Sequence, residues 1–423
     1  MNRRFSLTKL FVLVFLATLL LGLLTWVNYY YVLNNPGGSD FLPRWVGARK
    51  FLLQGISPYS EETTHEIHKL FYGRSATAGE DQVLFAYPLY SIIVFTPFSL
   101  ISDYNISRAI WMTVLEIAIT SIAIISIYLF HWRLSPIMLG FFLLFTILWY
   151  YGIRPLINAN VSIIVALMVL GAFFLLRSGH EWLAGFLLAL STIKPQMVVF
   201  LIIFILLWSI YRWRWRLLTS FLSSLLVMTG IFMVFVPNWI SQNLLQMLAY
   251  PAYTNTTTPG ECFAVWLPGI GRQLGWILTM GVTVVMLVEW WLAIKKDNGW
   301  FVWAAYLTLV LTQLIGIQTA TENYILLFPA LVMVFVTWDE LYRRWGQFLI
   351  IVTCLLFFFG IWWLFFATIQ WGNQPVQAPI MFFPLPVFLL ISMYLIRKRI
   401  LNPEPAQDFT EETSSSKILS SLE

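Results

Sequence analysis

Charged residues are scarce in this chain. Asp, Glu, Lys and Arg make up 11% of its 423 residues, whereas about 25% is usual in a soluble domain. Cysteine is rarer still, because there are only two, and they cannot build a disulfide framework. These two cysteines do not form a metal-ligand motif either. The composition excludes an ordinary soluble globular protein.

Long apolar runs occupy most of the sequence. Hydrophobic residues make up 59% of it and aromatic residues 17%, and apolar runs of about 18 residues or more recur along the chain, as in a polytopic helical membrane protein. The first run, about residues 10–33, is too long for a signal-peptide core, so we interpret it as a retained helix. We expect one integral-membrane domain over residues 1–399, followed by a disordered cytoplasmic tail, 400–423, which is rich in Pro, Ser and acids.

Basic residues indicate the orientation. The net charge of +5 does not suggest nucleic-acid binding, because Lys and Arg sit at the ends of apolar runs. The positive-inside rule predicts cytoplasmic N- and C-termini and an outer loop over residues 34–84. The first half does not fit simple alternation. Arg177 would lie outside if each of its apolar runs crossed the membrane in turn, whereas the later helices put it inside. These runs lie near 85–101, 106–130, 136–151 and 161–176. One of these runs is therefore expected to be short or re-entrant.

The outer loop predicts two short helices. Pro43 suits the start of the first and Gly55 its end, with Arg44, Arg49 and Lys50 on a polar face that meets lipid head groups. The second runs from about Ser60, a capping residue, to Tyr72, before Gly73. His65 and His68 are three residues apart on it. They either supply two ligands to a metal ion or, as the default prediction, lie on a solvated helix face.

Asp40 lies between the first long helix and the first short one. Its carboxylate either faces a cavity near the membrane or is a solvated loop acid that caps the helix at Pro43. Glu322 and Asn323 belong to a short outward loop, where they either approach the same cavity or cap a turn. If Asp40 carries no chemistry, Glu322 and then Asp81 are the next candidate bases.

Lys194 is the most informative charge in the apolar part. The segment from Trp182 to Tyr211 has about 30 residues, so a single helix would be about 45 Å long, which exceeds a hydrocarbon core of about 30 Å. Lys194 and Pro195 interrupt it, so two shorter helices meeting at Lys194 are expected. An intramembrane lysine is a functional candidate, here for a phosphate, or else a side chain that snorkels to the interface. Arg154, in "GIRPLINANVS", is a second cation of this kind, or an interfacial loop residue.

The order of several motifs resembles glycosyltransferase family 87, whose members belong to the GT-C superfamily. The motifs are "SDFLPRWVGARKFLLQGISPY", "FAYPLYSIIVFTPFSLI", "SRAIW" and "NANVSIIVALMVLGAFFLLRSGHEWLAGFLLALSTIKPQ". The resemblance covers about residues 39–216, and beyond it only the hydropathy pattern and "ENYILLFPAL" agree. It implies an all-α, GT-C-type bundle of about 11–13 transmembrane helices, each needing about 20 apolar residues, with interfacial helices in the first outer loop.

The resemblance also implies an activity. It is the transfer of a hexose, typically mannose, from a polyprenyl-phosphate donor to a lipid or glycan acceptor at the outer face of the membrane, with no metal or cofactor. An acid in the first outer loop is the general base, which is Asp40 here. The element "NANV" retains Asn160 and has Asn158 loosely in place of a glutamine, and "IKP" is intact at Lys194. The late loop, "TENY", lacks the family's frequent histidine.

Each residue then has an expected role. A phosphate leaving group requires a base for the acceptor hydroxyl and cations for the departing charge, and a single displacement inverts the anomeric centre. The residues expected to bind the donor phosphate are Lys194, Arg154 and Asn160. Those expected to line the cavity for donor and acceptor are Arg44, Tyr59, Asn158, Gln196, Glu322 and Asn323.

Two other classes of protein fit the composition. A transporter also has broken helices and intramembrane charges, but it favours an internal repeat, and the sequence shows none. A flippase or a structural partner of envelope enzymes is the third interpretation. The long outer loop favours the transferase over the transporter.

Overall fold

The computed structural model describes residues 7–77, 79–249, 258–296, 298–317, 320–369 and 377–401, and within them the protein is all helical, with no strand. The helices of the first half are α1 (Leu7–Asn34), α2 (Leu42–Gln54), α3 (Glu61–Tyr72), η1 (Leu89–Ser91), α4 (Ile92–Ser99), α5 (Tyr104–Leu129), α6 (Pro136–Leu148), α7 (Tyr150–Ile157), α8 (Ser162–Arg177), α9 (Glu181–Ser191) and α10 (Pro195–Tyr211). Those of the second half are α11 (Trp215–Phe235), α12 (Trp239–Ala249), α13 (Pro259–Trp266), α14 (Gly271–Lys295), α15 (Asn298–Thr312), η3 (Thr321–Leu327), α16 (Phe328–Tyr342), α17 (Arg344–Leu355), η4 (Leu356–Gly360), α18 (Ile361–Thr368), η5 (Pro379–Phe382) and α19 (Pro384–Leu401).

The lengths of these helices fit a polytopic membrane protein. In the described part of the chain, seven helices are long and apolar enough to cross a membrane, or eight if the bent pair α6 and α7 is one span. Five shorter apolar helices of 10–17 residues accompany them. The all-α membrane fold is thus confirmed, and a count of about 11–13 spans, each normally needing about 20 residues, requires that most of the shorter helices also cross.

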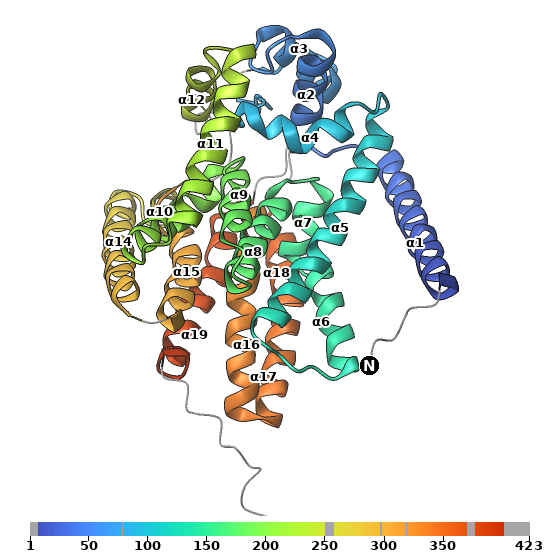
Figure 1. The fold of residues 1–423 in the computed structure, drawn as a ribbon. Helices are drawn as coiled ribbons and strands as arrows, with labels where there is room; N and C mark the ends of the chain where they lie inside the picture. The colour runs from blue at the N-terminus through green and yellow to red at the C-terminus, as the bar shows by residue number, and fades with distance from the viewer. Residues whose placement is uncertain are drawn as a thin grey trace, which may run out of the picture.

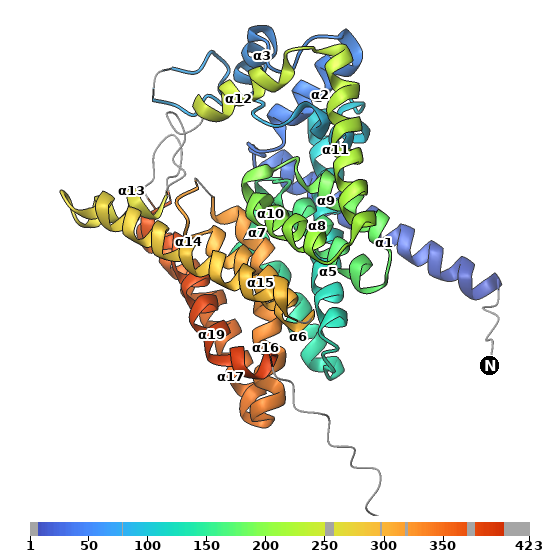
Figure 2. The same ribbon diagram turned by 60° about the vertical axis from the view of Figure 1, so that its left-hand side comes forward.

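The helices form a bundle with a separate cap at one end. Figure 1 shows α2, α3 and α12 together at that end, while α16 and α17 extend to the opposite end and α1 lies at the side. Figure 2 shows α13 and α14 along the flank. We call the end with α2, α3 and α12 the capped end and the other the far end. Helix α1 packs on α5 through polar groups, since Asn28 Nδ2 donates to Thr113 Oγ1 at 3.1 Å and to Glu116 Oε2 at 2.9 Å.

The position of Arg177 shows which apolar run of the first half does not cross the bundle. Helix α5 begins at the capped end, where the Tyr104 hydroxyl donates to Gly37 O at 3.1 Å. Arg177 contacts the Leu129 carbonyl and His131 at the other end of α5. The run 85–101 forms only η1 and α4, which are too short to cross and lie with the cap. It is therefore the short run that the sequence required.

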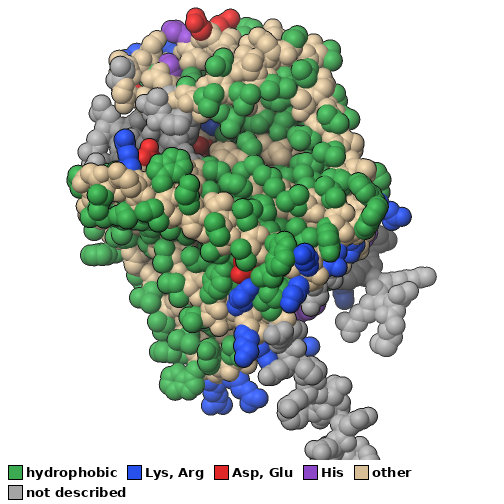
Figure 3. Space-filling view, turned by 90° about the vertical axis from the view of Figure 1, so that its left-hand side faces the viewer, with side chains coloured by type: hydrophobic (Ala, Val, Ile, Leu, Met, Phe, Trp, Pro, Cys, Tyr) green, Lys and Arg blue, Asp and Glu red, His purple; other side chains and the backbone are tan. Residues whose placement is uncertain are grey.

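Lys and Arg side chains gather towards the far end of the molecule. Figure 3 shows them mostly around the lower part of the molecule. This distribution is the one that the positive-inside rule expects for the cytoplasmic side. A cytoplasmic far end accordingly remains our prediction.

The cap helices begin and end where the sequence predicts. Pro43 lies in the first turn of α2, and Gly55 ends that helix in the left-handed conformation with φ 70°. The Ser60 side chain accepts a hydrogen bond from Thr63 N at 3.2 Å, and Gly73 ends α3 with φ 72°. These signals act within one helical turn, so the sequence alone carries them.

The basic residues of α2, however, contact protein groups. The Lys50 ammonium pairs with Glu62 at 2.9 Å and with Glu66 at 2.7 Å, both on α3. The Arg44 guanidinium lies 3.9 Å from the centre of the Tyr87 ring, and Arg49 donates to Ser99 O at 3.0 Å. The prediction of a lipid-facing polar face was wrong for Arg44 and Lys50, because both are buried against protein partners, whereas Arg49 is half-buried.

His68 is likewise a structural residue. It is buried, its Nε2 lies 2.6 Å from Gln82 O, and its Nδ1 accepts from Ala76 N at 3.2 Å. The default prediction of a solvated face was therefore wrong for this histidine. Among the described residues, no group of three or more His, Cys, Asp or Glu side chains is arranged to hold a metal ion.

Two half-buried polar contacts join helices at the far end. Glu289 of α14 pairs with Arg397 of α19 at 3.0 Å. The Trp132 indole, which follows α5, donates from Nε1 to Asp339 Oδ2 on α16 at 2.9 Å. Both contacts lie away from Asp40.

Candidate active site

Three segments far apart in the sequence meet at the capped end. They are the turn before α2, which carries Asp40, the turn between α7 and α8, which carries Asn160, and the turn between α9 and α10, which carries Lys194. Asn160 Nδ2 donates to Asp40 Oδ2 at 2.8 Å, and Lys194 Nζ donates to Asn160 Oδ1 at 2.9 Å. One carboxamide therefore joins the carboxylate to the ammonium, and we call these three residues the acid–amide–cation cluster.

The charges around Asn160 fix the orientation of its amide. A carboxylate only accepts hydrogen bonds and an ammonium only donates them, so the NH2 group must face Asp40 and the oxygen must face Lys194. The same oxygen accepts from Ser162 N at 2.9 Å, at the start of α8. Asn160 is 2% exposed, so its rotamer is held by neighbours on every side.

Lys194 is a buried cation, as the sequence predicted. It is 5% exposed and precedes Pro195 at the break between α9 and α10, which confirms two helices there instead of one. The Tyr90 hydroxyl lies 2.7 Å from Thr192 Oγ1 and so supports this turn. A buried ammonium is costly without a counter-charge, so the site favours an anionic ligand beside Lys194.

Glu322 forms a second group next to the cluster. It is 6% exposed in η3, and its Oε1 accepts from Asn158 Nδ2 at 3.0 Å and lies 3.4 Å from Arg154 Nε. Its carbonyl accepts from Ser162 Oγ at 3.0 Å. Asn158 and Asn160 are two residues apart in one turn. The carboxylates of Glu322 and Asp40 therefore accept hydrogen bonds from the same segment.

Four other predicted residues lie outside these contacts. The Tyr59 hydroxyl donates to Tyr87 O at 2.5 Å, beside the ring on which Arg44 stacks, so both residues belong to the cap. Gln196 is half-buried in the first turn of α10, and Asn323 is buried in η3. No hydrogen bond between described residues joins any of the four to Asp40.

Asp81 is a third carboxylate of this region, which the sequence suggested only as a substitute base. Its Oδ1 accepts from Val83 N at 2.8 Å. Burial raises the pKa of the Asp81 carboxyl, and the nearby charge of Asp40 raises it further, while the hydrogen bond from Val83 N and the charges of Arg44 and His68 act in the opposite direction. The acid thus lies within electrostatic range of Asp40. No local pattern in the sequence announces this, because the approach depends on the fold of the outer loop.

We expect Asp81→Asn to raise the melting temperature at pH 7. A raised pKa means that the folded protein holds the proton more tightly than the unfolded chain, so stability is lost as the pH rises through the folded pKa. Asn cannot ionise and still accepts from the Val83 amide. Melting curves of both proteins between pH 4 and pH 8 test this, and the advantage should shrink towards low pH. A lower melting temperature for the variant at pH 7 would contradict it.

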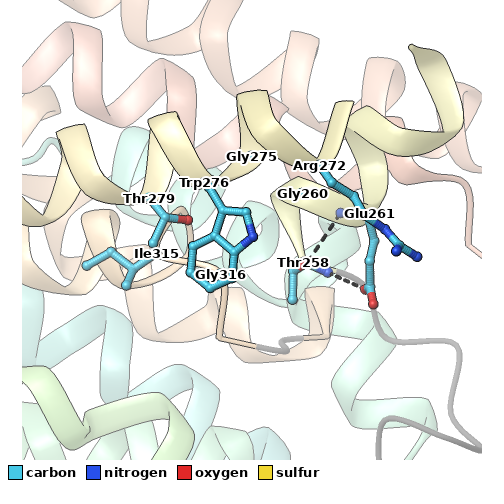
Figure 4. A pocket seen from close by; sticks show the side chains of 9 residues that line it. All are labelled: Thr258, Gly260, Glu261, Arg272, Gly275, Trp276, Thr279, Ile315 and Gly316. Atoms are coloured by element: carbon cyan, nitrogen blue, oxygen red, sulfur yellow. Dashed lines mark hydrogen bonds between the residues drawn. The ribbon is translucent and has the colours of Figure 1, made fainter. Parts of the chain in front are cut away.

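A separate cavity of about 240 Å³ lies on the flank. Figure 4 shows it between α13, the start of α14 and the turn after α15, with the Trp276 indole facing Thr279 and Gly316. Thr258 and Glu261 on its rim form a reciprocal helix cap. Its lining shares no residue with the acid–amide–cation cluster, so we assign it no chemistry.

Fold and site together define a polytopic, all-helical membrane protein with a buried cluster of acid, amide and cation at one end. The chain belongs to glycosyltransferase family 87, because the model of that family matches residues 85–317, which is more than half of it. The matched range contains Arg154, Asn160 and Lys194 but neither Asp40 nor Glu322. No curated protein and no solved structure matches the chain. The protein is therefore a membrane glycosyltransferase.

Proposed function

We propose that the protein transfers a hexose, with mannose the expected sugar, from a polyprenyl-phosphate donor to a lipid or glycan acceptor at the outer face of the cytoplasmic membrane. The observation that supports this most strongly is the contact of Asp40 and Lys194 with the two ends of the Asn160 amide. A proton acceptor and a phosphate-binding cation are the two groups that such a transfer requires.

The reaction is a single displacement. Asp40 takes the proton of the acceptor hydroxyl, whose oxygen forms a bond to C1 of the sugar while the bond between C1 and the phosphate oxygen breaks. Polyprenyl phosphate leaves with the electron pair, and the anomeric configuration inverts. Lys194, whose ammonium donates to Asn160 Oδ1, stabilises the charge that develops on the phosphate. Arg154, in the last turn of α7, is the second cation. These cations supply the positive charge, so the proposed step uses no metal.

The separation of the two charged groups fits this geometry. Asp40 and Lys194 form no ion pair within 4.0 Å in the described part of the chain, because Asn160 lies between them. A base and a leaving group must act on opposite sides of C1, as the two carboxyl groups of an inverting glycosidase do when a water fits between them.

Proteoliposomes test the proposed function. Purified protein is given a polyprenyl-phosphate hexose, labelled in the sugar, and a glycolipid acceptor. We expect a labelled acceptor with inverted configuration, one polyprenyl phosphate released per transfer, and no loss of rate with a metal chelator. The rival function is a flippase, which the broken helices α9 and α10 also suit. Movement of the labelled donor between leaflets with its glycosyl bond intact would establish the rival instead.

The predicted topology places Asp40 outside. Single cysteines at Lys69 on α3 and at Gln347 on α17 are both exposed, and the native Cys262 and Cys354 are buried and give a low background. A membrane-impermeant thiol reagent added to intact cells should label position 69 and not position 347. Labelling of position 347 alone would reverse the topology and place the site at the cytoplasmic face.

A further inference from the structure

We propose that one face of α5 is a positioning device for the acid–amide–cation cluster. Arg108 and Trp111 on this helix hold the segment before Asp40 and the turn before Asn160, so that the two side chains meet. Tyr104, Arg108 and Trp111 are spaced i, i+4 and i+7, which places them on one side of a helix. The activity readout of this inference rests on the proposed function, whereas its structural readout does not.

Arg108 joins two segments that are far apart in the sequence. The residue is 1% exposed, its Nη1 donates to Asn35 O at 2.9 Å, and its Nη2 donates to Ile157 O at 3.2 Å. Both acceptors are backbone carbonyls, one before Asp40 and one before Asn160. A planar guanidinium can point two donors in fixed directions, whereas an ammonium is a single point of charge. Arginine is therefore suited to this bridge and lysine is not.

Trp111 holds the two residues that adjoin the catalytic contact. Its Nε1 donates to Ala159 O at 2.8 Å, and Ala159 precedes Asn160. Its ring stacks on Phe41, which follows Asp40, with the ring centres 5.6 Å apart and the planes at 11°. Ala159 has φ 55°, a conformation that few residues other than glycine adopt. A bond to its carbonyl therefore stabilises a turn that the backbone alone would not favour.

The backbone before Asp40 also packs tightly on this face. Gly38 has φ 75°, and a Cβ atom there would lie 2.7 Å from Arg108 Nε and 2.7 Å from the Tyr104 hydroxyl. Only glycine fits so close to both side chains. The Tyr104 hydroxyl donates to Gly37 O at 3.1 Å, so the helix face is bonded to the loop as well as packed against it.

Trp111→Phe removes the indole N–H and keeps an aromatic ring beside Phe41. We expect kcat to fall at least tenfold with the donor KM unchanged within twofold, because a small displacement of a catalytic group slows chemistry more than binding. Trp132→Phe is the control, since it removes the indole hydrogen bond, here half-buried, of the residue that follows α5 at the far end. It should lower the melting temperature comparably and leave kcat near that of the wild type.

Hydrogen exchange followed by mass spectrometry provides the readout that does not need activity. In Arg108→Lys and in Trp111→Phe, segments 35–41 and 157–161 should exchange faster together. In the controls Trp132→Phe and Arg397→Lys, which alter contacts at the far end, they should not.

The outcomes separate the inference from the proposed function. An inactive wild type, with coupled faster exchange in the variants, would overturn the transferase and support the positioning device. If the wild type is active, two results would overturn the positioning device. One is wild-type kcat and wild-type exchange in both α5 variants. The other is a loss of kcat in Trp132→Phe as large as that in Trp111→Phe.

Discussion

Asp40→Asn should abolish sugar transfer while expression and donor binding stay near those of the wild type. Loss of a general base typically costs about 10² to 10⁴ in rate. Asn has the size of Asp, and its oxygen can still accept from Asn160 Nδ2, so the acid–amide–cation cluster keeps its shape. The amide cannot take a proton at neutral pH. Initial rates of transfer at saturating donor, with donor affinity measured in parallel, show the effect.

Asp103→Asn is the matched control for this substitution. Asp103 lies at the same end of the molecule, where it caps α5 by accepting from Ile106 N at 2.9 Å. Asn and Asp cap helices about equally well, so the control should keep the full rate. If the Asp40→Asn variant transferred sugar at a rate within about tenfold of the wild-type rate, the base would lie elsewhere. Glu322 would be the first candidate and Asp81 the second.

Lys194→Met should weaken donor binding by about 10- to 100-fold, since a hydrogen bond to a charged group contributes about 1.5–3 kcal/mol and each 1.4 kcal/mol changes the dissociation constant about tenfold. Methionine keeps the length and volume of the side chain and removes the charge, so the folding yield should change little. Equilibrium binding of a polyprenyl-phosphate sugar to purified protein measures the loss.

Lys50→Met is the control for Lys194→Met. Lys50 is also buried, but it pairs with Glu62 and Glu66 inside the cap. Its replacement leaves two acids without their cation and should lower the melting temperature without changing donor affinity. Wild-type donor affinity in Lys194→Met would mean that Lys194 only orients Asn160 and that the phosphate binds elsewhere.

Local signals in the sequence predicted the local structure well. Gly55, Ser60 and Gly73 each specify a helix end through backbone geometry or a cap within one turn, and the structure has all three. Pro195 after Lys194 marked the helix break for the same reason. The surroundings of Arg44 and Lys50 were not predictable in this way, because their partners belong to other elements. An amphipathic pattern indicates that a face is polar, but it does not say whether lipid or protein covers it.

The candidate site was predictable as a set of residues but not as an arrangement. Asp40, Asn160 and Lys194 were selected by chemistry and by the order of the family motifs, and the structure brings them into contact. Arg108 and Trp111 were missed although they lie in the quoted motif "SRAIW". A tryptophan in an apolar protein predicts a place at the membrane interface, and only the fold shows that this one is buried against Phe41 and Ala159.

The most direct test of the central claim presents one hexose on two leaving groups. Purified protein in proteoliposomes receives the same labelled sugar either as polyprenyl-phosphate hexose or as a nucleotide diphosphate hexose, with the same acceptor. We predict transfer from the lipid-linked donor, dependent on Asp40, and none from the nucleotide. Transfer from the nucleotide donor alone, or no glycosyl transfer from either donor while labelled lipid crosses the membrane, would contradict the assignment of the acid–amide–cation cluster as the active site of a polyprenyl-phosphate-dependent transferase.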